Sequence, residues 1–306
     1  MIYTVTLNPA VDYVIQVPAF KEGQLNVTQK ESKFPGGKGI NVSRVLKRLG
    51  VVSTNLGFVG GFTGQFIEDK LKEEALQTDF VTVAGDTRIN IKLKSTEETE
   101  INGQGPVITE IALQELKAQL NQLTSEDLVV FSGSVPKGVA PTIYVEFVEL
   151  LSKKGIPFVV DISSKQLLDI LPFKPVLIKP NHHELSAIFE TEFASVTEML
   201  PYGEKLRSLG AQNVLISMGK DGALLFSDKG IYQVEGLSGV LKNSVGAGDS
   251  MVAGFISQWV ASKETSACLT YGVAAGSATA FSDDLATGEA ILALVEKVSI
   301  TTIKEY

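Results

Sequence analysis

The sequence predicts a doubly wound α/β fold, in which helices cover both faces of a mainly parallel sheet. Short runs rich in β-branched residues alternate with amphipathic segments of helical period. Several runs are apolar on successive residues, which is typical of strands buried on both faces, and the alternation implies parallel βαβ connections. The predicted strands are Ile2–Leu7, Thr54–Val59, Leu128–Ser132, Pro157–Asp161, Val176–Lys179 and Val214–Ser217. The predicted helices are Gly39–Leu49, Ile111–Leu123 and Thr142–Lys154, followed by a helical last third with Gly248–Val260, Glu264–Phe281 and Gly288–Val298.

Two stretches interrupt this alternation and predict a second group of strands. Asp12–Val17 and Leu25–Phe34 have strand patterns with no helix between them. Arg88–Ile101 alternates polar and apolar residues, as a hairpin with one solvent-exposed face does. These strands either pair into a small separate sheet or extend one edge of the main sheet, and the pattern alone favours neither arrangement.

The composition bounds the kind of protein. Of the 306 residues, 44% are apolar, which suffices for a large core, and one α/β domain with an appendage fits this length as well as two domains. The net charge of −8 disfavours nucleic acid and anionic membranes as partners, since both attract basic proteins. With a single cysteine, Cys268, and no cationic leader before the first strand-like run, we expect a cytoplasmic protein.

Several familiar nucleotide and metal motifs are missing from the sequence. Neither G-x-x-x-x-G-K-[ST] nor G-x-G-x-x-G occurs, which excludes a P-loop enzyme and the usual dinucleotide fingerprint. His182 and His183 are adjacent, so we expect their side chains to diverge into solvent rather than to chelate one ion.

The most informative segment is NSVGAGDSMVAGF at 243–255. Gly246 and Gly248 flank a small alanine just before an apolar helical pattern, so the backbone N–H groups are unobstructed and point with the helix dipole toward an anion. Asp249 stands in the first helical turn, where a carboxylate can accept a proton from an attacking hydroxyl while the amides stabilise the transferred group. The alternative is a structural glycine turn whose aspartate caps a helix.

A second glycine-rich segment, GGKGINVSR at 36–44, also opens a predicted helix. Its glycines allow a ligand to approach the backbone closely. Lys38 and Asn41 are the polar side chains placed to hold sugar oxygens or an anion. A tight strand-to-helix turn explains the glycines equally well, so this segment alone does not identify a site.

Together these segments resemble the two signature segments of the PfkB branch of the ribokinase-like carbohydrate kinases. Five further motifs of that family occur in the expected order, and the resemblance spans nearly the whole chain. They are TLNPAVD at 6–12, TRINIK at 87–92, SGSVPKG at 132–138, KPNHHEL at 179–185 and SMGKDG at 217–222. The resemblance implies one ribokinase-like α/β kinase domain over residues 1–306, with lid strands inserted at about 12–35 and 88–103.

The resemblance also implies roles on the nucleotide side. Asp249 would be the catalytic base, and Asn181 and Glu184 would hold Mg²⁺ through water. Alternatively, Glu184 is a structural residue whose negative charge in the first helical turn interacts favourably with the helix dipole. The anion hole implied for the transferring phosphoryl group of ATP is Gly246, Ala247 and Gly248. The other implied nucleotide contacts are Lys179, Ser217, Gly219, Gly222, Gly248 and Ser277.

On the sugar side, the resemblance implies contacts from both glycine-rich and lid segments. Arg88, with Lys92 or Lys38, would neutralise the phosphate already on the sugar, because a guanidinium pairs with phosphate in a bidentate manner. Without the resemblance, Arg88 and Lys92 would be interpreted as surface charges on alternate strand positions. The lid would close over the sugar and exclude water, and we expect a homodimer through it. The implied sugar contacts are Asp12, Gly37, Lys38, Asn41, Arg88 and Ser134.

The implied activity is that of a sugar-phosphate kinase using ATP and Mg²⁺. GGKG together with NSVGAGDSMVAGF is similar to kinases of fructose 1-phosphate and of tagatose 6-phosphate, and NPAVD and TRINIK are closer to the former. Kinases of fructose 6-phosphate tend to carry glycine at Lys38 and basic residues at Gln24 and Asn26. We therefore expect fructose 1-phosphate as acceptor, with tagatose 6-phosphate as the alternative. A ribokinase or nucleoside kinase and a catalytically silent sugar-phosphate sensor are more remote. Relatives often have a monovalent-cation site near the loop before the glycine turn, and the residues leave such a site open here.

Overall fold

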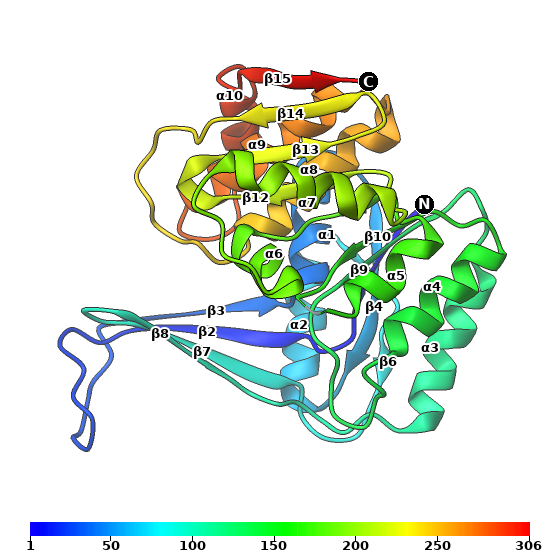
Figure 1. Cartoon of the computed structure of the whole chain (residues 1–306). Coiled ribbons are helices and arrows are strands. Elements are labelled where there is room, and N and C mark those ends of the chain that lie inside the picture. Colours follow the sequence, from blue (N-terminus) through cyan, green and yellow to red (C-terminus); the bar gives the residue numbers. More distant parts are fainter. Residues whose placement is uncertain (164) are drawn as a thin grey trace.

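The computed structural model describes residues 1–163 and 165–306 and shows an α/β body with a small sheet projecting from one side (Figure 1). In this part of the chain the body sheet has eleven strands, in the order β15-β14-β13-β12-β11-β10-β9-β1-β4-β5, with β6 paired to β4. From β12 to β5 the pairings are parallel, which confirms the predicted fold class. The parallel strands are β1 (Ile2–Thr6), β4 (Ser53–Val59), β5 (Gln77–Thr78), β6 (Val81–Thr82), β9 (Leu128–Ser132), β10 (Phe158–Asp161), β11 (Leu177–Ile178) and β12 (Val214–Ser217).

Helices cover both faces of this sheet. Successive residues of β9 alternate between two cores: Val129 and Phe131 face one, Leu128 and Val130 the other. Burial on both faces therefore explains the continuous apolar run. The first core is covered by α3 (Glu110–Gln122), α4 (Ile143–Lys153), α5 (Leu167–Ile170), α6 (His182–Phe189) and α7 (Val196–Ser208). The second is covered by α1 (Lys38–Arg48), α8 (Ala247–Ala261), α9 (Thr265–Ala280) and α10 (Gly288–Val295).

The prediction of a helical last third is wrong at the sheet edge. Three antiparallel strands, β13 (Ala223–Phe226), β14 (Gly230–Val234) and β15 (Ile300–Glu305), extend the sheet beyond β12. β13 is an apolar run of four residues, too short for its period to identify it, and β15 is mostly exposed and is held by backbone pairing with β14. In residues 1–163 and 165–306, no helix combines the length and apolarity that spanning a bilayer requires.

Among the helices outside the sequence predictions, α2 (Gly61–Glu73) and α7 contain breakers that weaken their signal. α2 has glycine at two of its first four positions. The helix α7 contains Pro201, although Ser195 caps its start by accepting a hydrogen bond from the Glu198 amide. Glycine and proline lower intrinsic helix propensity, and here tertiary packing outweighs that preference.

The irregular segments form a separate four-stranded sheet rather than an extension of the main one (Figure 1). Its strand order is β3-β2-β7-β8, with β2 and β7 parallel and the outer pairs antiparallel. The predicted strand Leu25–Phe34 begins too early, because Leu25 is 94% exposed in the loop before β3. The bounds are β2 (Ala10–Gln16), β3 (Lys30–Gly36), β7 (Arg88–Lys94) and β8 (Glu98–Asn102).

Candidate active site

A cleft of about 1320 Å³ lies between the small sheet and the body, at the carboxyl ends of β1, β9, β11 and β12. Ligands of open α/β sheets bind at this edge. Nearly all of the residues that the sequence predicts for nucleotide, sugar and metal line this one cleft, although they come from distant parts of the chain. They are Asp12, Gly37, Lys38, Asn41, Arg88, Ser134, Lys179, Asn181, Glu184, Ser217, Gly219, Gly246, Ala247, Gly248, Asp249 and Ser277.

The glycine-rich turn before α8 has the geometry of an anion site. Gly246 precedes the helix with φ of +79°, a left-handed conformation that costs glycine little. A Cβ built on Gly248 would lie 3.1 Å from Lys179 Nζ, so the lysine ammonium stands directly beside the turn. Helix-start amides and an adjacent ammonium group together favour a phosphoryl group.

Asp249 lies in the first turn of α8 with only 6% of its surface exposed. Its Oδ2 accepts a 2.9 Å hydrogen bond from Asn41 Nδ2, so the amide that the sequence predicts as a sugar contact orients this carboxylate. Burial is the main cause that raises the pKa of Asp249 to about 6; Asp161 also raises it, while Lys38, Asn41 and Lys179 lower it. A carboxylate that titrates near the working pH suits a general base.

Asp161, the last residue of β10, connects the two lysines of the site, although no sequence motif singles it out. Its Oδ2 lies 3.3 Å from Lys38 Nζ and its Oδ1 lies 3.5 Å from Lys179 Nζ. Burial would raise the pKa of Asp161, but Lys179 and Lys38 hold it below its ordinary value. The same carboxylate raises the pKa of Lys38, which therefore stays cationic. The available signal was an acidic residue ending a predicted buried strand.

Asn181 and Glu184 form a reciprocal capping box at the start of α6. Asn181 Oδ1 accepts from the Glu184 backbone N–H and Glu184 Oε2 accepts from the Asn181 N–H, both at 2.8 Å, while Ser163 Oγ donates to Glu184 Oε1. The structural role foreseen for Glu184 is therefore present, yet Glu184 also lines the cleft. Mg²⁺ keeps several waters and takes one or two carboxylates beside nucleotide phosphates. As the carboxylate of the pair, Glu184 fits that chemistry through water, although the oxygens of both residues also accept the hydrogen bonds described here.

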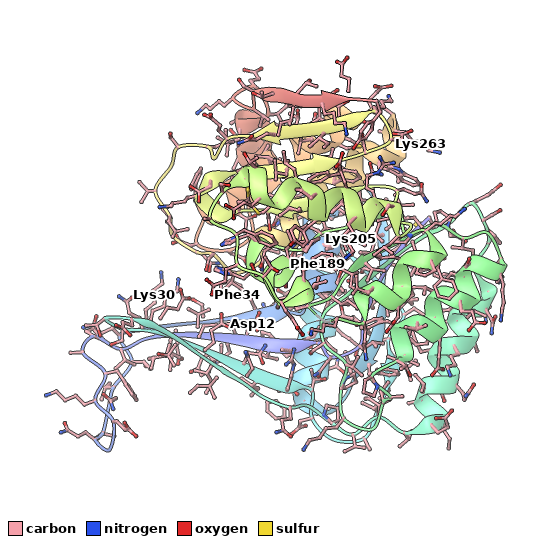
Figure 2. The ribbon with its side chains drawn as sticks, viewed as in Figure 1. Asp12, Lys30, Phe34, Phe189, Lys205 and Lys263 are labelled. Carbon is pink, nitrogen blue, oxygen red and sulfur yellow. The ribbon has the colours of Figure 1, made fainter. Side chains whose placement is uncertain are left out.

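The small sheet supplies the sugar side of the cleft. Asp12 on β2 accepts at Oδ1 a 3.0 Å hydrogen bond from Asn90 Nδ2 on the adjacent β7. Figure 2 shows Asp12 on the face of the small sheet that is turned toward the body. Asn90 is 7% exposed and its own Oδ1 is buried without a partner. After Arg88, Asn90 is therefore a further residue of the TRINIK segment that belongs to the site. The sequence analysis quoted Asn90 without assigning it a role.

Arg88 is fixed by backbone carbonyls instead of by an acid. Its Nε donates to the Asn8 carbonyl at 3.1 Å and its Nη1 donates to the Gly103 carbonyl at 3.2 Å. Lys92, four residues further along β7, is paired with Glu100 at 2.6 Å. The guanidinium of Arg88 therefore keeps its full charge for an anion in the cleft, whereas Lys92 is largely neutralised by its partner.

The nucleotide side brings three predicted residues together and leaves one out. Ser217, Gly219 and Ser277 line the cleft, and a β-bridge joins Ser217 to Asn181. Gly222 does not line it. Its backbone carbonyl accepts from Met218 N–H at 2.9 Å, and its φ is +94°, so this glycine closes the turn after β12 and packs against β14.

The expectation that the two histidines diverge is wrong. The rings of His182 and His183 lie close together, tilted by 40° with 3.9 Å between their centroids, and both line the cleft. Adjacent helical residues leave the axis about 100° apart, but rotation about χ1 and χ2 can still bring two planar rings together. His183 is exposed and His182 is partly buried.

Fold and site together are those of a carbohydrate kinase. The family described as pfkB family carbohydrate kinase matches residues 5–289, and the chain belongs to this family. A 1-phosphofructokinase of Bacillus subtilis (strain 168) is 48% identical, with 99% of this chain and 100% of the relative covered. A D-tagatose-1-phosphate kinase of Bacillus licheniformis is 40% identical, with 98% and 99% covered.

A solved structure extends the comparison to bound ligands. Phosphofructokinase-2 from Escherichia coli in complex with substrates and products is similar with a TM-score of 0.90 and 28% identity, covering 97% of this chain and 99% of that chain. The same enzyme in complex with potassium matches with a TM-score of 0.90, and its tetrameric inhibited form with 0.89. These matches agree with the ribokinase-like arrangement of body and small sheet.

Proposed function

We propose that this chain transfers the terminal phosphoryl group of ATP to fructose 1-phosphate and thereby makes fructose 1,6-bisphosphate. The observation that carries the proposal is the buried Asp249 carboxylate, which lies in one cleft with a glycine turn and the Lys179 ammonium group. A base, an anion site and a cation are the parts that phosphoryl transfer to a hydroxyl requires. The acceptor is supported by the 48% identical relative, which is named 1-phosphofructokinase.

The geometry suggests how these residues would act. The acceptor hydroxyl at C6 would lie against Asp249 and give its proton to the carboxylate as its oxygen bonds to the γ-phosphorus and the bond from that phosphorus to ADP breaks. The amides of residues 246–248 and Lys179 would stabilise the charge on the transferring group. Bound Mg²⁺, held through water by Glu184, would neutralise nucleotide charge. Asn41 would keep the carboxylate aimed at the hydroxyl.

We assign the phosphate already on the sugar to Arg88. Its bonds to carbonyls set the direction of the guanidinium without consuming its charge. Asp12, held by Asn90, would accept from sugar hydroxyl groups, and Gly37 and Ser134 complete the lining on this side. The phosphate and the acceptor hydroxyl would then be bound at opposite ends of the sugar.

Tagatose 1-phosphate is a second candidate acceptor, because the 40% identical relative is named D-tagatose-1-phosphate kinase. Tagatose differs from fructose only in configuration at C4, so the phosphate and the C6 hydroxyl keep their places. Tagatose 6-phosphate, the alternative expected from the sequence, carries its phosphate at the other end of the sugar. The names of both relatives carry a 1-phosphate, which favours that end for this chain.

An acceptor panel tests the proposal. Purified protein with ATP and Mg²⁺ would be given fructose 1-phosphate, tagatose 1-phosphate, tagatose 6-phosphate, fructose 6-phosphate and ribose, and ADP release would be measured by a coupled assay. We expect the highest kcat/KM with fructose 1-phosphate. A higher value for a tagatose phosphate would change the acceptor, and no turnover with any hexose phosphate would favour the sensor. Repeating the panel with K⁺ replaced by a large organic cation tests monovalent-cation activation, for which the potassium complex of the neighbour is the support.

We also propose that residues 1–306 act as one cytoplasmic kinase domain with the small sheet as lid, and that two copies associate through it. Apolar side chains on and next to the small sheet support this association. The exposed ones are Phe20, Leu25, Val27, Ile89 and Ile101. Light scattering after gel filtration should give the mass of a dimer for the wild type and of a monomer for a Leu25→Asp/Ile101→Asp double variant. A wild-type monomer would contradict this assembly.

A further inference from the structure

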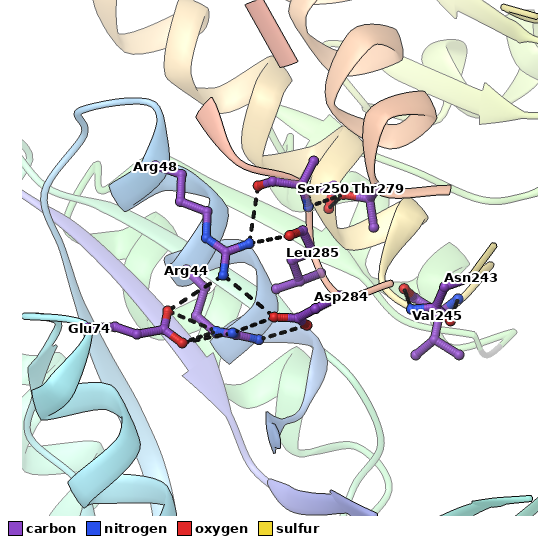
Figure 3. Close-up of polar contacts among 10 residues, drawn as sticks. Arg44, Arg48, Glu74, Asn243, Val245, Ser250, Thr279, Asp284 and Leu285 are labelled. Carbon is purple, nitrogen blue, oxygen red and sulfur yellow. Dashed lines mark hydrogen bonds and ion pairs between the residues drawn. The ribbon is translucent and has the colours of Figure 1, made fainter. Parts of the chain in front are cut away.

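One face of helix α1 lies next to the glycine turn before α8 and carries three polar side chains. Asn41, Arg44 and Arg48 are spaced by three and four residues, which places them on the same side of a helix. Asn41 holds Asp249 as described above. The two arginines contact the segment that follows α9, Asp284–Ala286, as Figure 3 shows.

Arg44 is a buried clamp between two acids. Its side chain is 4% exposed. Its Nη2 donates to Asp284 Oδ2 at 2.8 Å and its Nη1 donates to Asp284 Oδ1 at 3.3 Å. On the other side, its Nε and Nη2 donate to Glu74 Oε1 at 3.0 and 2.7 Å. Bidentate pairs of this kind fix direction as well as distance, so Arg44 sets the position of Asp284 relative to α1.

The residue after Asp284 contacts the glycine turn itself. A Cβ built on Gly246 would lie 2.6 Å from Leu285 Cδ2 and 3.6 Å from Asn41 Nδ2, so the turn is enclosed between Leu285 and α1. Leu285 is 6% exposed, and Arg48 donates to its carbonyl and, at 3.1 Å, to that of Ala286. The position of Leu285 therefore limits where the turn can lie.

A second route joins the same segment to the first turn of α8. The Ala286 N–H donates to Thr279 Oγ1 at 3.1 Å, and that hydroxyl lies 2.8 Å from Ser250 Oγ. Ser250 follows Asp249 directly. The segment Asp284–Ala286 thus contacts both parts of the transfer site: the turn through Leu285, and the helix start through Thr279 and Ser250 (Figure 3).

We propose that Arg44 is a positioning residue for phosphoryl transfer: through Asp284 and Leu285 it holds the glycine turn at a fixed place relative to Asp249. The proposal rests on the proposed function, because it assigns the turn to the transferring group. Transfer depends on alignment of the attacking oxygen, the phosphorus and the stabilising amides, and displacements of about 1 Å can cost as much as 100-fold in rate. Loosening the Asp284 side of the clamp should therefore lower kcat more than it weakens binding of the sugar.

The chain offers a matched pair of variants. Glu74 and Asp284 bind the same arginine at 2.7 and 2.8 Å and are 32% and 31% exposed, but only Asp284 adjoins the turn. Glu74→Gln and Asp284→Asn each remove one charge from the clamp and keep the side-chain shape. Both should lower the unfolding midpoint to a similar extent. Asp284→Asn should in addition reduce kcat by roughly tenfold or more, with KM for fructose 1-phosphate within about twofold of wild type, whereas Glu74→Gln should keep near-normal kcat.

Leu285→Ala provides an independent arm, since it removes the contact with Gly246 and leaves both ion pairs intact. It should reproduce the loss of kcat seen in Asp284→Asn, including in the case where Asp284→Asn is too unstable to assay. Equal kcat in Glu74→Gln and Asp284→Asn, or a normal kcat in Leu285→Ala, would overturn the proposal. Wild-type turnover is measured in the same experiment, so its absence identifies failure of the proposed function and not of the clamp.

Discussion

The buried Asp249 carboxylate should destabilise the folded protein, and Asp249→Asn tests its role through stability and activity at once. The pKa of this group is raised from 3.8 to about 6, first of all by burial. A shift of about two units corresponds to about 3 kcal/mol of penalty on the ionised form in the folded state. Because the folded pKa lies above the unfolded one, the penalty is absent below about pH 4, grows between pH 4 and 6, and is complete at higher pH.

Asparagine has no charge to bury and can still accept the hydrogen bond from Asn41. We therefore expect Asp249→Asn to be more stable than wild type by up to about 3 kcal/mol at pH 8 and nearly equal to it at pH 4. In the same variant, kcat should fall by roughly 10²- to 10⁴-fold, the usual contribution of a general base, while sugar binding is largely retained.

Urea unfolding at the two pH values and steady-state ADP release would measure both effects. Asp228→Asn is a suitable control, because Asp228 is exposed at the turn between β13 and β14 and should change neither quantity. If Asp249→Asn showed no gain in stability at pH 8, the burial argument would be refuted. Near-normal turnover in the variant would remove Asp249 from its role as base.

Three further predictions concern the charged groups around this carboxylate. Arg88→Ala should raise KM for fructose 1-phosphate by roughly 10- to 100-fold, the worth of a charged hydrogen bond of about 1.5–3 kcal/mol, with kcat changed little; a loss confined to kcat in steady-state assays would contradict the assignment. Asp161→Asn should reduce the free energy of unfolding by about 3–5 kcal/mol at neutral pH, because it leaves two ammonium groups without their shared buried partner. Since the pKa of Asp161 is depressed, that stabilisation is lost as pH falls through its folded pKa, and the difference in urea unfolding should shrink in acid. The pH profile of kcat should fall on the acid side near pH 6 in wild type and shift to lower pH in Asp161→Asn, because Asp161 raises the pKa of Asp249; an unshifted limb would contradict the coupling.

The parallel part of the fold follows from local pattern. A strand such as Leu128–Ser132, buried on both faces, leaves a continuous apolar run, and its predicted bounds coincide with β9. The antiparallel edge leaves no comparable signal. β15 consists largely of exposed residues and pairs with β14, 66 or more residues earlier in the chain, and such pairing is not encoded in local hydrophobicity.

Site residues could be predicted where a motif places a charged or polar side chain next to a glycine turn or a strand end. Asp249, Lys179 and Glu184, which the sequence analysis names as site residues, all lie in the cleft. What could not be predicted are contacts between segments with no shared motif. Asp161 reaches Lys38 across 123 residues and Arg44 reaches Asp284 across 240, and only the folded chain brings these charges together.

The role of Asn41 shows a different limit of the sequence patterns. A motif indicated that its amide belongs to the site and contacts the sugar, whereas in the structure the amide donates to Asp249. The direction of a side chain depends on the crossing of α1 and α8, which pack closely against each other around this hydrogen bond. Residue type and spacing therefore predict membership of a site better than partners within it.

The most direct test of the central claim is a crystal structure of the protein with fructose 1-phosphate and a non-hydrolysable ATP analogue. We predict the γ-phosphate against the amides of residues 246–248 and the C6 hydroxyl oxygen about 2.6–3.2 Å from a carboxylate oxygen of Asp249. A triphosphate bound away from that turn, or an acceptor hydroxyl out of reach of Asp249, would contradict it.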